Sequence, residues 1–167
     1  MRRRLCSLFL VLSLLSLPAY AHQASETVTR GQFLLLLWRA GGEVPFDKTA
    51  HPFTDLEEDA FSQAAAWAFN EGLICGVGSD LFAPYRSLTR EECAVLLRRW
   101  DSYLGRDVFY SEGAAACNDF FDISPWADDS LYWACGTGRM DWRYNRLAPL
   151  SPVTWAEALS YFNLELF

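Results

Sequence analysis

The sequence predicts an all-α domain in which three capped helices form a central bundle, surrounded by outer helices and long loops. Three observations support this prediction. One helix-start pattern occurs three times, the segment after each start is apolar around almost its whole circumference, and a longer pattern occurs twice between the starts. Similar units repeated along a chain are typical of a fold built from repeats.

Each helix start is a threonine followed three residues later by Glu or Gln and then by an apolar run. This is the capping-box signature, in which the hydroxyl accepts a hydrogen bond from an unpaired backbone amide and the Glu or Gln side chain reaches back. The threonines lie 60 and 65 residues apart. The sequence therefore predicts three helix N-termini with these capping pairs: Thr29 and Gln32, Thr89 and Glu92, and Thr154 and Glu157.

The apolar content of the three predicted helices decides where they lie. Residues 33–38 have no polar face, and residues 93–97 and 158–162 have almost none. Such helices must be buried by their neighbours, and the simplest arrangement packs all three against one another. Glycines at 41–42 and 105 follow the first two helices, where C-cap glycines are expected.

The longer pattern describes two units. Each has an extended entry ending in aspartate, a helix with a Trp-Ala pair, a glycine, a loop closed by proline, and then a capped start. The matching residues are Asp55, Trp67, Gly72 and Pro84 in the first unit, and Asp122, Trp133, Gly138 and Pro149 in the second. The pattern predicts outer helices at roughly 58–71 and 126–136.

The first 21 residues have the features of a secretory signal peptide. Three arginines precede an apolar run, and a small-x-small cleavage pattern follows. We therefore expect a secreted protein with one domain over residues 22–167, in which no later segment is long and uncharged enough to span a bilayer. This part has 11 basic and 21 acidic residues, a net charge of −10. Nucleic acid is disfavoured as a partner, because its binding requires a basic surface.

Four cysteines follow the expected leader, and none forms a C-x-x-C pair that would favour zinc or redox chemistry. Secretion permits disulfides, so Cys75 could pair with Cys93 and Cys117 with Cys135. The favoured interpretation is that they are small buried hydrophobic residues. No metal or cofactor is predicted.

No pattern in the sequence favours catalysis. A nucleophile elbow and a phosphate loop are both missing from it. Acidic clusters at 57–59 and 128–129 could supply the two carboxylates of a glycosidase. Such clusters are more typical of a solvated first helical turn. The sequence therefore predicts a protein that is not an enzyme.

Together the patterns resemble the S-layer homology (SLH) family, whose repeats carry a Phe-x-Asp entry, a Trp-Ala helix, a glycine, a Phe-x-Pro loop and a Thr-Arg-Ala-Glu helix start. The likeness covers about residues 28–167. It implies a pseudo-threefold SLH-type bundle with a partial first repeat at 22–45 and two further repeats at 51–105 and 117–167. One of three expected outer helices is then missing.

The resemblance implies a non-catalytic module at the cell wall or cell surface, which holds an anionic and often pyruvylated secondary cell-wall polysaccharide in grooves between repeats. Arg30 and Arg90 match the family's chief ligand contact, at helix N-termini where free amides and an arginine fork favour an anion. We expect both guanidinium groups to face solvent. Trp155 replaces the third arginine, so we expect two working grooves, with Trp155 either weakening the third or stacking on a sugar ring.

The expected polysaccharide-binding residues are Arg30, Arg90, Asp55, Asp122, Trp67, Trp133, Gly72, Gly138 and Trp155. Structural interpretations stand beside these roles, because tryptophans at helical spacing are typical core anchors and the aspartates could cap a helix. An alternative function is a structural or protein-interaction subunit of the cell envelope, which completes its fold with a partner chain or a second copy. A carbohydrate-processing enzyme ranks last.

Overall fold

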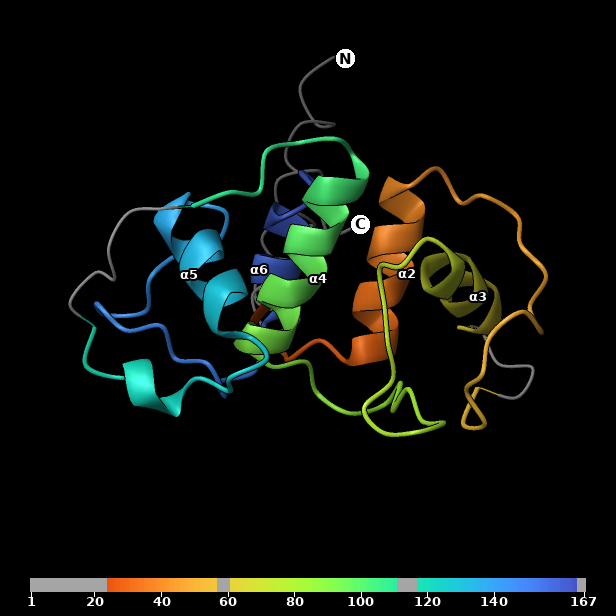
Figure 1. Ribbon diagram of the computed structural model, residues 1–167, viewed down its shortest axis with the longest axis horizontal. Helices are drawn as coiled ribbons and strands as arrows, with labels where there is room; N and C mark the ends of the chain where they lie inside the picture. The colour runs from red at the N-terminus through yellow and green to blue at the C-terminus, as the bar shows by residue number, and fades with distance from the viewer. Residues whose placement is uncertain (1–23, 57–60, 111–116, 165–167) are drawn as a thin grey trace, which may run out of the picture.

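The computed structural model describes residues 24–56, 61–110 and 117–164, and in these ranges it is helical, with isolated β-bridges and no strand. The all-α prediction is confirmed. The expected signal peptide lies outside the described residues. None of the described helices combines the length and apolarity needed to cross a bilayer. The elements are α2 (Arg30–Ala40), α3 (Ser62–Asn70), α4 (Arg90–Tyr103), the 3-10 helix η1 (Phe120–Asp122), α5 (Asp128–Gly136) and α6 (Trp155–Ser160) (Figure 1).

The helices α2, α4 and α6 begin directly after the three threonines of the capping pattern. At α2, the Thr29 hydroxyl accepts a hydrogen bond from the Gln32 amide at 3.2 Å, and the Gln32 side chain accepts one from the Thr29 amide at 2.9 Å. The same reciprocal pair begins α4 and α6. The sequence predicts these starts correctly because both hydrogen bonds lie within four consecutive residues.

Two closed rings of backbone hydrogen bonds join the three helix starts. The first ring runs from Val28 N to Val153 O at 2.9 Å, from Val153 N to Leu88 O at 2.9 Å, and from Leu88 N to Val28 O at 3.0 Å. In the second ring, the amide of the first residue of each helix donates to a carbonyl three residues before the next capping threonine. These bonds run from Arg30 N to Arg86 O, from Arg90 N to Ser151 O and from Trp155 N to Glu26 O, each at 2.9 Å. First-turn amides have no partner inside their own helix, and the second ring supplies one.

The outer helices α3 and α5 pack against α2 and α4 respectively. Figure 1 shows them at opposite ends of the molecule. Each carries the tryptophan of the longer pattern, and Trp67 and Trp133 are only 1% and 3% exposed. An indole enclosed by the core cannot reach a ligand, so the binding role expected for these two residues is corrected here to that of core anchors.

Two glycines of the predicted binding set, Gly72 and Gly138, end the outer helices. Each has φ +71°, and a Cβ at either position would meet nothing within 4 Å. The need for glycine is therefore conformational, because an L-residue in the left-handed region costs about 1 kcal/mol. Their role in this structure is to end α3 and α5.

The four cysteines after the expected leader are free, and neither of the two possible bridges forms. Cys93 and Cys135 are buried, as the favoured interpretation predicted, whereas Cys75 is exposed. Burial raises the pKa of the Cys135 thiol to about 11 and also raises that of Cys93.

We expect iodoacetamide to label Cys75 rapidly in the folded protein and to leave Cys93 and Cys135 unlabelled until the chain is denatured. The thiolate is the reactive form, and a buried thiol with a raised pKa supplies little of it. Mass spectrometry of the digested protein before and after denaturation measures the labelling. A disulfide-linked peptide pair that contains Cys75 and Cys93 would contradict the prediction.

Candidate functional site

An aspartate closes the long loop of each complete unit, half-buried in the first unit and buried in the second. Asp55 accepts hydrogen bonds from the Phe82 amide at 2.8 Å and the Ala83 amide at 2.6 Å. The second unit repeats this arrangement, with Asp119 accepting from the Leu147 amide at 3.0 Å and the Ala148 amide at 2.7 Å. Both alanines have positive φ, +59° and +51°. The carboxylates therefore hold two strained loop turns in place.

The sequence analysis matched Asp122 to Asp55 as the entry aspartate and expected both to bind polysaccharide, but in the structure the equivalent of Asp55 is Asp119. Asp122 lies exposed in η1, three residues further along the chain. A spacing signal could have identified Asp119, which precedes its loop partner Leu147 by 28 residues, as Asp55 precedes Phe82 by 27. Asp122 resembled the entry motif because it also follows a phenylalanine.

Arg90 is enclosed at the contact between α4 and the second unit's loop. Its side chain is 0% exposed. Nε donates to Leu147 O at 2.9 Å, Nη2 donates to Asp141 O at 2.7 Å, and Nη1 lies 3.4 Å from a Glu157 carboxylate oxygen. The expectation that this guanidinium faces solvent is wrong, because carbonyls and a carboxylate of the following unit surround it.

Arg30 makes the equivalent contacts one unit earlier. Its Nε donates to Phe82 O at 2.9 Å, and its Nη1 lies 3.3 Å from a Glu92 oxygen. The guanidinium carbon also lies 4.8 Å from the centre of the Phe82 ring. A cation at the first position of a helix is unfavourable for the helix dipole. The presence of arginine at this position is therefore explained by its contacts with the next unit and not by helix formation.

The third contact between helix starts has lost both members of this ion pair. α6 begins with Trp155 where α2 and α4 begin with arginine, and α2 carries Gln32 where the other helices carry glutamate. Trp155 N still donates to Glu26 O in the second ring. Loss of the cation and of its carboxylate at the same contact avoids an unpaired charge.

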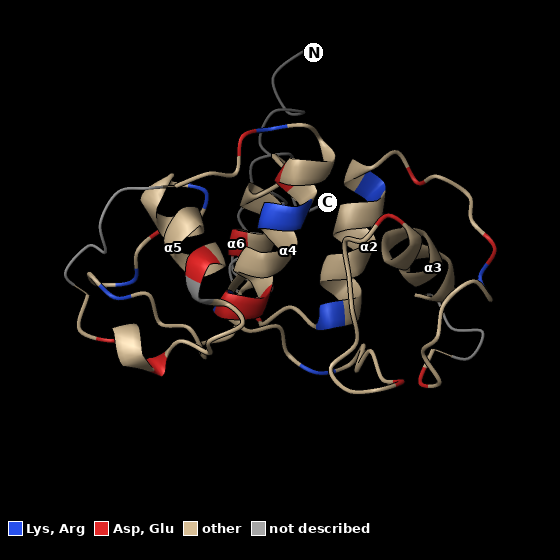
Figure 2. Cartoon of the chain, viewed as in Figure 1, with Lys and Arg blue, Asp and Glu red and all other residues tan. Residues whose placement is uncertain are grey.

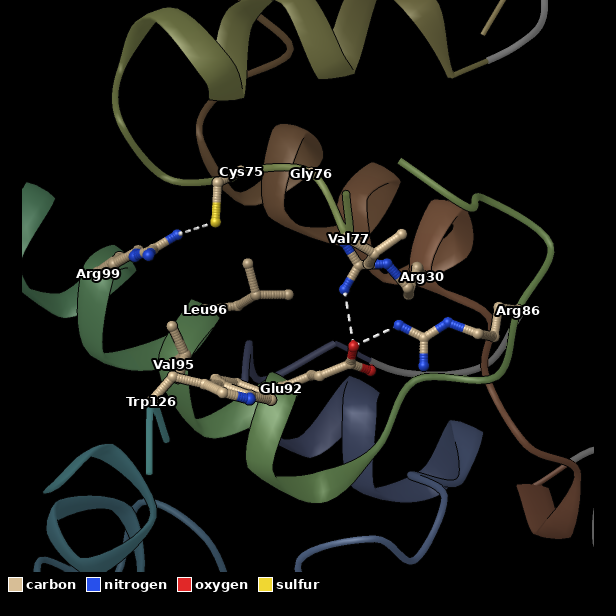
Figure 3. A pocket seen from close by; sticks show the side chains of 10 residues that line it. All are labelled: Arg30, Cys75, Gly76, Val77, Arg86, Glu92, Val95, Leu96, Arg99 and Trp126. Carbon is tan, nitrogen blue, oxygen red and sulfur yellow. Dashed lines mark hydrogen bonds and ion pairs between the residues drawn. The ribbon is translucent and has the colours of Figure 1, made fainter. Parts of the chain in front are cut away.

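Arg30 also lines a cavity between α2 and α4, which we call the α2–α4 groove. Its volume is about 470 Å³, and Figure 3 shows its lining side chains. They come from α2, from α4, from the loop between α3 and α4, and from a turn before α5. The lining residues are Arg30, Cys75, Gly76, Val77, Arg86, Glu92, Val95, Leu96, Arg99 and Trp126.

Three arginines and one glutamate give the α2–α4 groove a local positive charge. Glu92 is paired with both Arg30 and Arg86 (Figure 3). Burial, only partly offset by Glu92, lowers the pKa of Arg30. An arginine stays protonated despite such a shift, so the cation is retained. Figure 2 shows the basic position at the first turn of α2 and the acidic positions at the first turn of α4.

A second hollow of about 700 Å³ lies beside the loop of the second unit. Two arginines and two aspartates line it, so its charges balance. Arg143 is already bound to Glu157 through Nη2 at 2.7 and 2.6 Å, and Arg146 lies 3.6 Å from Asp119. An anionic ligand would therefore be attracted less strongly to this hollow than to the α2–α4 groove.

The middle of the chain, residues 52–94, matches the model of the S-layer homology domain. An endoglucanase of Bacillus sp. (strain KSM-635) is 32% identical over 107 residues, which are 64% of this chain and 11% of that protein. An amylopullulanase of Thermoanaerobacterium thermosulfurigenes is 28% identical and exoglucanase XynX of Acetivibrio thermocellus 29%, each over 139 residues and 82% of this chain. These stretches are 7% and 13% of the two proteins.

The matched stretch contains the Asp55 entry, the Trp67 helix, the loop held by Asp55 and the Thr89 helix start. The fold therefore defines a helical module built from similar units. Residues 52–94 of the chain are therefore identified as an S-layer homology domain. This domain is non-catalytic on its own and anchors proteins to cell-wall polysaccharide, which associates the chain with the cell surface.

Proposed function

We propose that the chain binds an anionic secondary cell-wall polysaccharide in the α2–α4 groove. The observation that carries the proposal is the local excess of arginine in a chain whose net charge is −7. A cavity lined by one sign of charge concentrates ligands of the opposite sign even when the whole protein repels them. A carboxylate, such as that of a ketal-linked pyruvate, matches the planar donor fork of arginine.

The shape of the groove also suits an oligosaccharide. Its volume lies within the 300–1,000 Å³ usual for small-ligand pockets, and Val77, Val95 and Leu96 supply apolar surface beside the cations. Arg86 is the cation best placed for a ligand, because its side chain is 44% exposed while that of Arg30 is 7% exposed. Arg30 would then complete the positive field from the wall of the groove.

One working groove replaces the two that the sequence suggested, since Arg90 is enclosed. Trp155 is half-buried at the start of α6, and stacking of a sugar on it stays a proposal. We also infer secretion, the division into units 22–45, 51–105 and 117–167, and a pseudo-threefold relation among them. The two hydrogen-bond rings support that relation, because each residue in a ring has an equivalent in the other two units.

Replacing Arg86 and Arg99 together by alanine is expected to weaken binding to purified Bacillus cell walls at least about tenfold. Charge-assisted hydrogen bonds contribute about 1.5–3 kcal/mol each, and both arginines line the groove. Co-sedimentation over a range of salt concentrations measures the loss. The dependence of affinity on salt should also become shallower.

The matched control is Arg106→Ala, because Arg106 is an exposed arginine that lies outside the groove and pairs with Asp101. It removes one positive charge from the chain without changing the cavity. If Arg106→Ala and the double variant lose wall binding equally, net charge and not the groove governs retention, and the proposed site is wrong.

A further inference from the structure

One wall of the α2–α4 groove is an aromatic side chain that neither pattern in the sequence includes. Trp126 lies in the turn before α5 and is 59% exposed. It belongs to the third unit, whereas the other lining residues come from the first two. Figure 3 shows its indole beside Val95 and Glu92, along the opposite side of the cavity from Cys75. An exposed indole beside cations is a surface on which a ring can stack.

The turn that carries Trp126 is fixed to α4 by a buried carboxylate. Glu91, 3% exposed, accepts hydrogen bonds from the Ser124 amide and from the Ser124 hydroxyl, both at 3.0 Å. The turn closes through Ala127 N, which donates to Ser124 O at 2.8 Å. Ile123 and Ala127 on either side are buried in the core. The backbone that carries the exposed Trp126 is thus fixed by the buried Ile123 and Ala127 and by the two Glu91–Ser124 hydrogen bonds.

Glu91 is the exception among the three helix starts. The other two carry Gly31 and Ala156 at the same position. At α2, the Phe61 ring lies 3.0 Å from where a Cβ of Gly31 would be, so an aromatic ring and not a hydrogen-bonded turn covers that helix start. The capping boxes of α2 and α6 form with a small residue at this position, so capping does not explain the buried carboxylate of Glu91 in α4. Its contacts explain it, because both go to the turn before Trp126.

We propose that Trp126 is a stacking platform for a pyranose ring next to the acidic sugar, and that Glu91 is its positioning residue. This inference rests on the proposed function of the α2–α4 groove. The CH face of a pyranose is apolar and matches the face of an indole, while the arginines that line the groove attract the neighbouring carboxylate. The ligand class is therefore an acidic oligosaccharide of at least two rings, and not an isolated carboxylate.

The test is calorimetric titration with wall polysaccharide released from Bacillus cell walls by hydrofluoric acid. Trp126→Ala should raise Kd about tenfold, a difference of about 1.4 kcal/mol, and Trp126→Phe should restore part of the affinity. The salt dependence of binding should stay that of the unmodified protein, because no charge is removed. Sodium pyruvate, which has the carboxylate but no ring, should bind weakly and equally to the unmodified protein and to Trp126→Ala.

The outcomes separate this inference from the function on which it rests. If Trp126→Ala and Trp126→Phe both bind like the unmodified protein while the Arg86 and Arg99 double variant has lost binding, the platform is wrong and the groove stands. If all three variants bind normally, both proposals fail. Circular dichroism and melting temperature show whether each variant is folded. If Trp126→Ala does not fold, Trp126→Phe still tests the proposal.

Glu91 is tested by a pair of variants. Glu91→Gln keeps an acceptor for the Ser124 amide and a donor for its hydroxyl, so affinity should stay within about twofold of the original. Glu91→Ala removes both hydrogen bonds and should raise Kd as Trp126→Ala does, with no further loss when the two are combined. Full additivity of Glu91→Ala and Trp126→Ala would overturn the positioning role.

Discussion

Replacing Arg90 by alanine is expected to lower the free energy of unfolding by about 3–5 kcal/mol, because each buried acceptor left without its donor costs about 1–3 kcal/mol and the lost side chain leaves a cavity. The substitution leaves Leu147 O and Asp141 O without their donor and opens space at the contact between α4 and the next unit. Arg90→Lys should recover only part of the stability, because a single ammonium group cannot reproduce the planar fork. Urea denaturation followed by tryptophan fluorescence measures both variants.

Arg106→Ala serves as the control for this prediction too. The Arg106 side chain is 57% exposed, and removing an exposed ion pair costs no more than about 1 kcal/mol. Equal stability of the Arg90 and Arg106 variants would show that Arg90 does not tie the units together. It would also return Arg90 to the ligand-binding role that the sequence suggested.

Replacing Asp119 by asparagine is expected to cost about 2–3 kcal/mol at neutral pH. The side chain is 1% exposed, and its two oxygens accept from two backbone amides. Asparagine supplies one acceptor and places an NH₂ group against the second amide, which leaves a buried donor unpaired. Thermal melting and urea denaturation at a series of pH values measure the effect.

The pH dependence of this difference has a definite sign. Burial alone would raise the pKa of Asp119, but the amides of Ala148 and Leu147 outweigh it and hold that pKa below its ordinary value. A carboxylate with a lowered pKa stabilises the folded state fully above its unfolded pKa of about 3.9, and the contribution is lost as pH falls through the folded value. The difference in stability between the two proteins should therefore begin to shrink below about pH 4 and close only below the folded pKa of Asp119.

Asp122→Asn is the matched control for Asp119. It makes the same chemical change three residues away, at an exposed position, and should leave stability unchanged within about 0.5 kcal/mol. The pair decides between the two alignments of the unit, because the sequence favoured Asp122 and the structure favours Asp119. Destabilisation by Asp122→Asn with none from Asp119→Asn would contradict the loop closure described above.

Prediction from sequence succeeded where the determining contacts are local. The capping boxes at Thr29, Thr89 and Thr154, the glycines that end the helices and the positions of the outer helices all depend on residues within a few positions of one another. The match of Asp122 to Asp55 failed because η1 adds residues between the entry aspartate and the outer helix. The aspartate is identified by a partner 28 residues away, and no local pattern contains that distance.

The arginines show the limit for the site. A helix start followed by arginine is the same in sequence whether the guanidinium meets solvent or a neighbouring carbonyl. Only the packing of the next unit's loop encloses Arg90 and leaves Arg30 at the edge of a cavity. Trp126 and its tether to Glu91 were missed for the same reason, since the groove assembles residues from three units that lie almost 100 positions apart.

By itself the sequence determined the helical class, the three capped starts and the membership in repeated units, because helix capping and apolar periodicity act over one or two turns. Tertiary structure alone decided that both arginines are buried and that only Arg30 lines the groove, which aspartate closes the second loop and which tryptophan faces the groove. Each of those depends on desolvation and on hydrogen bonds between distant segments, and these exist only after the units pack.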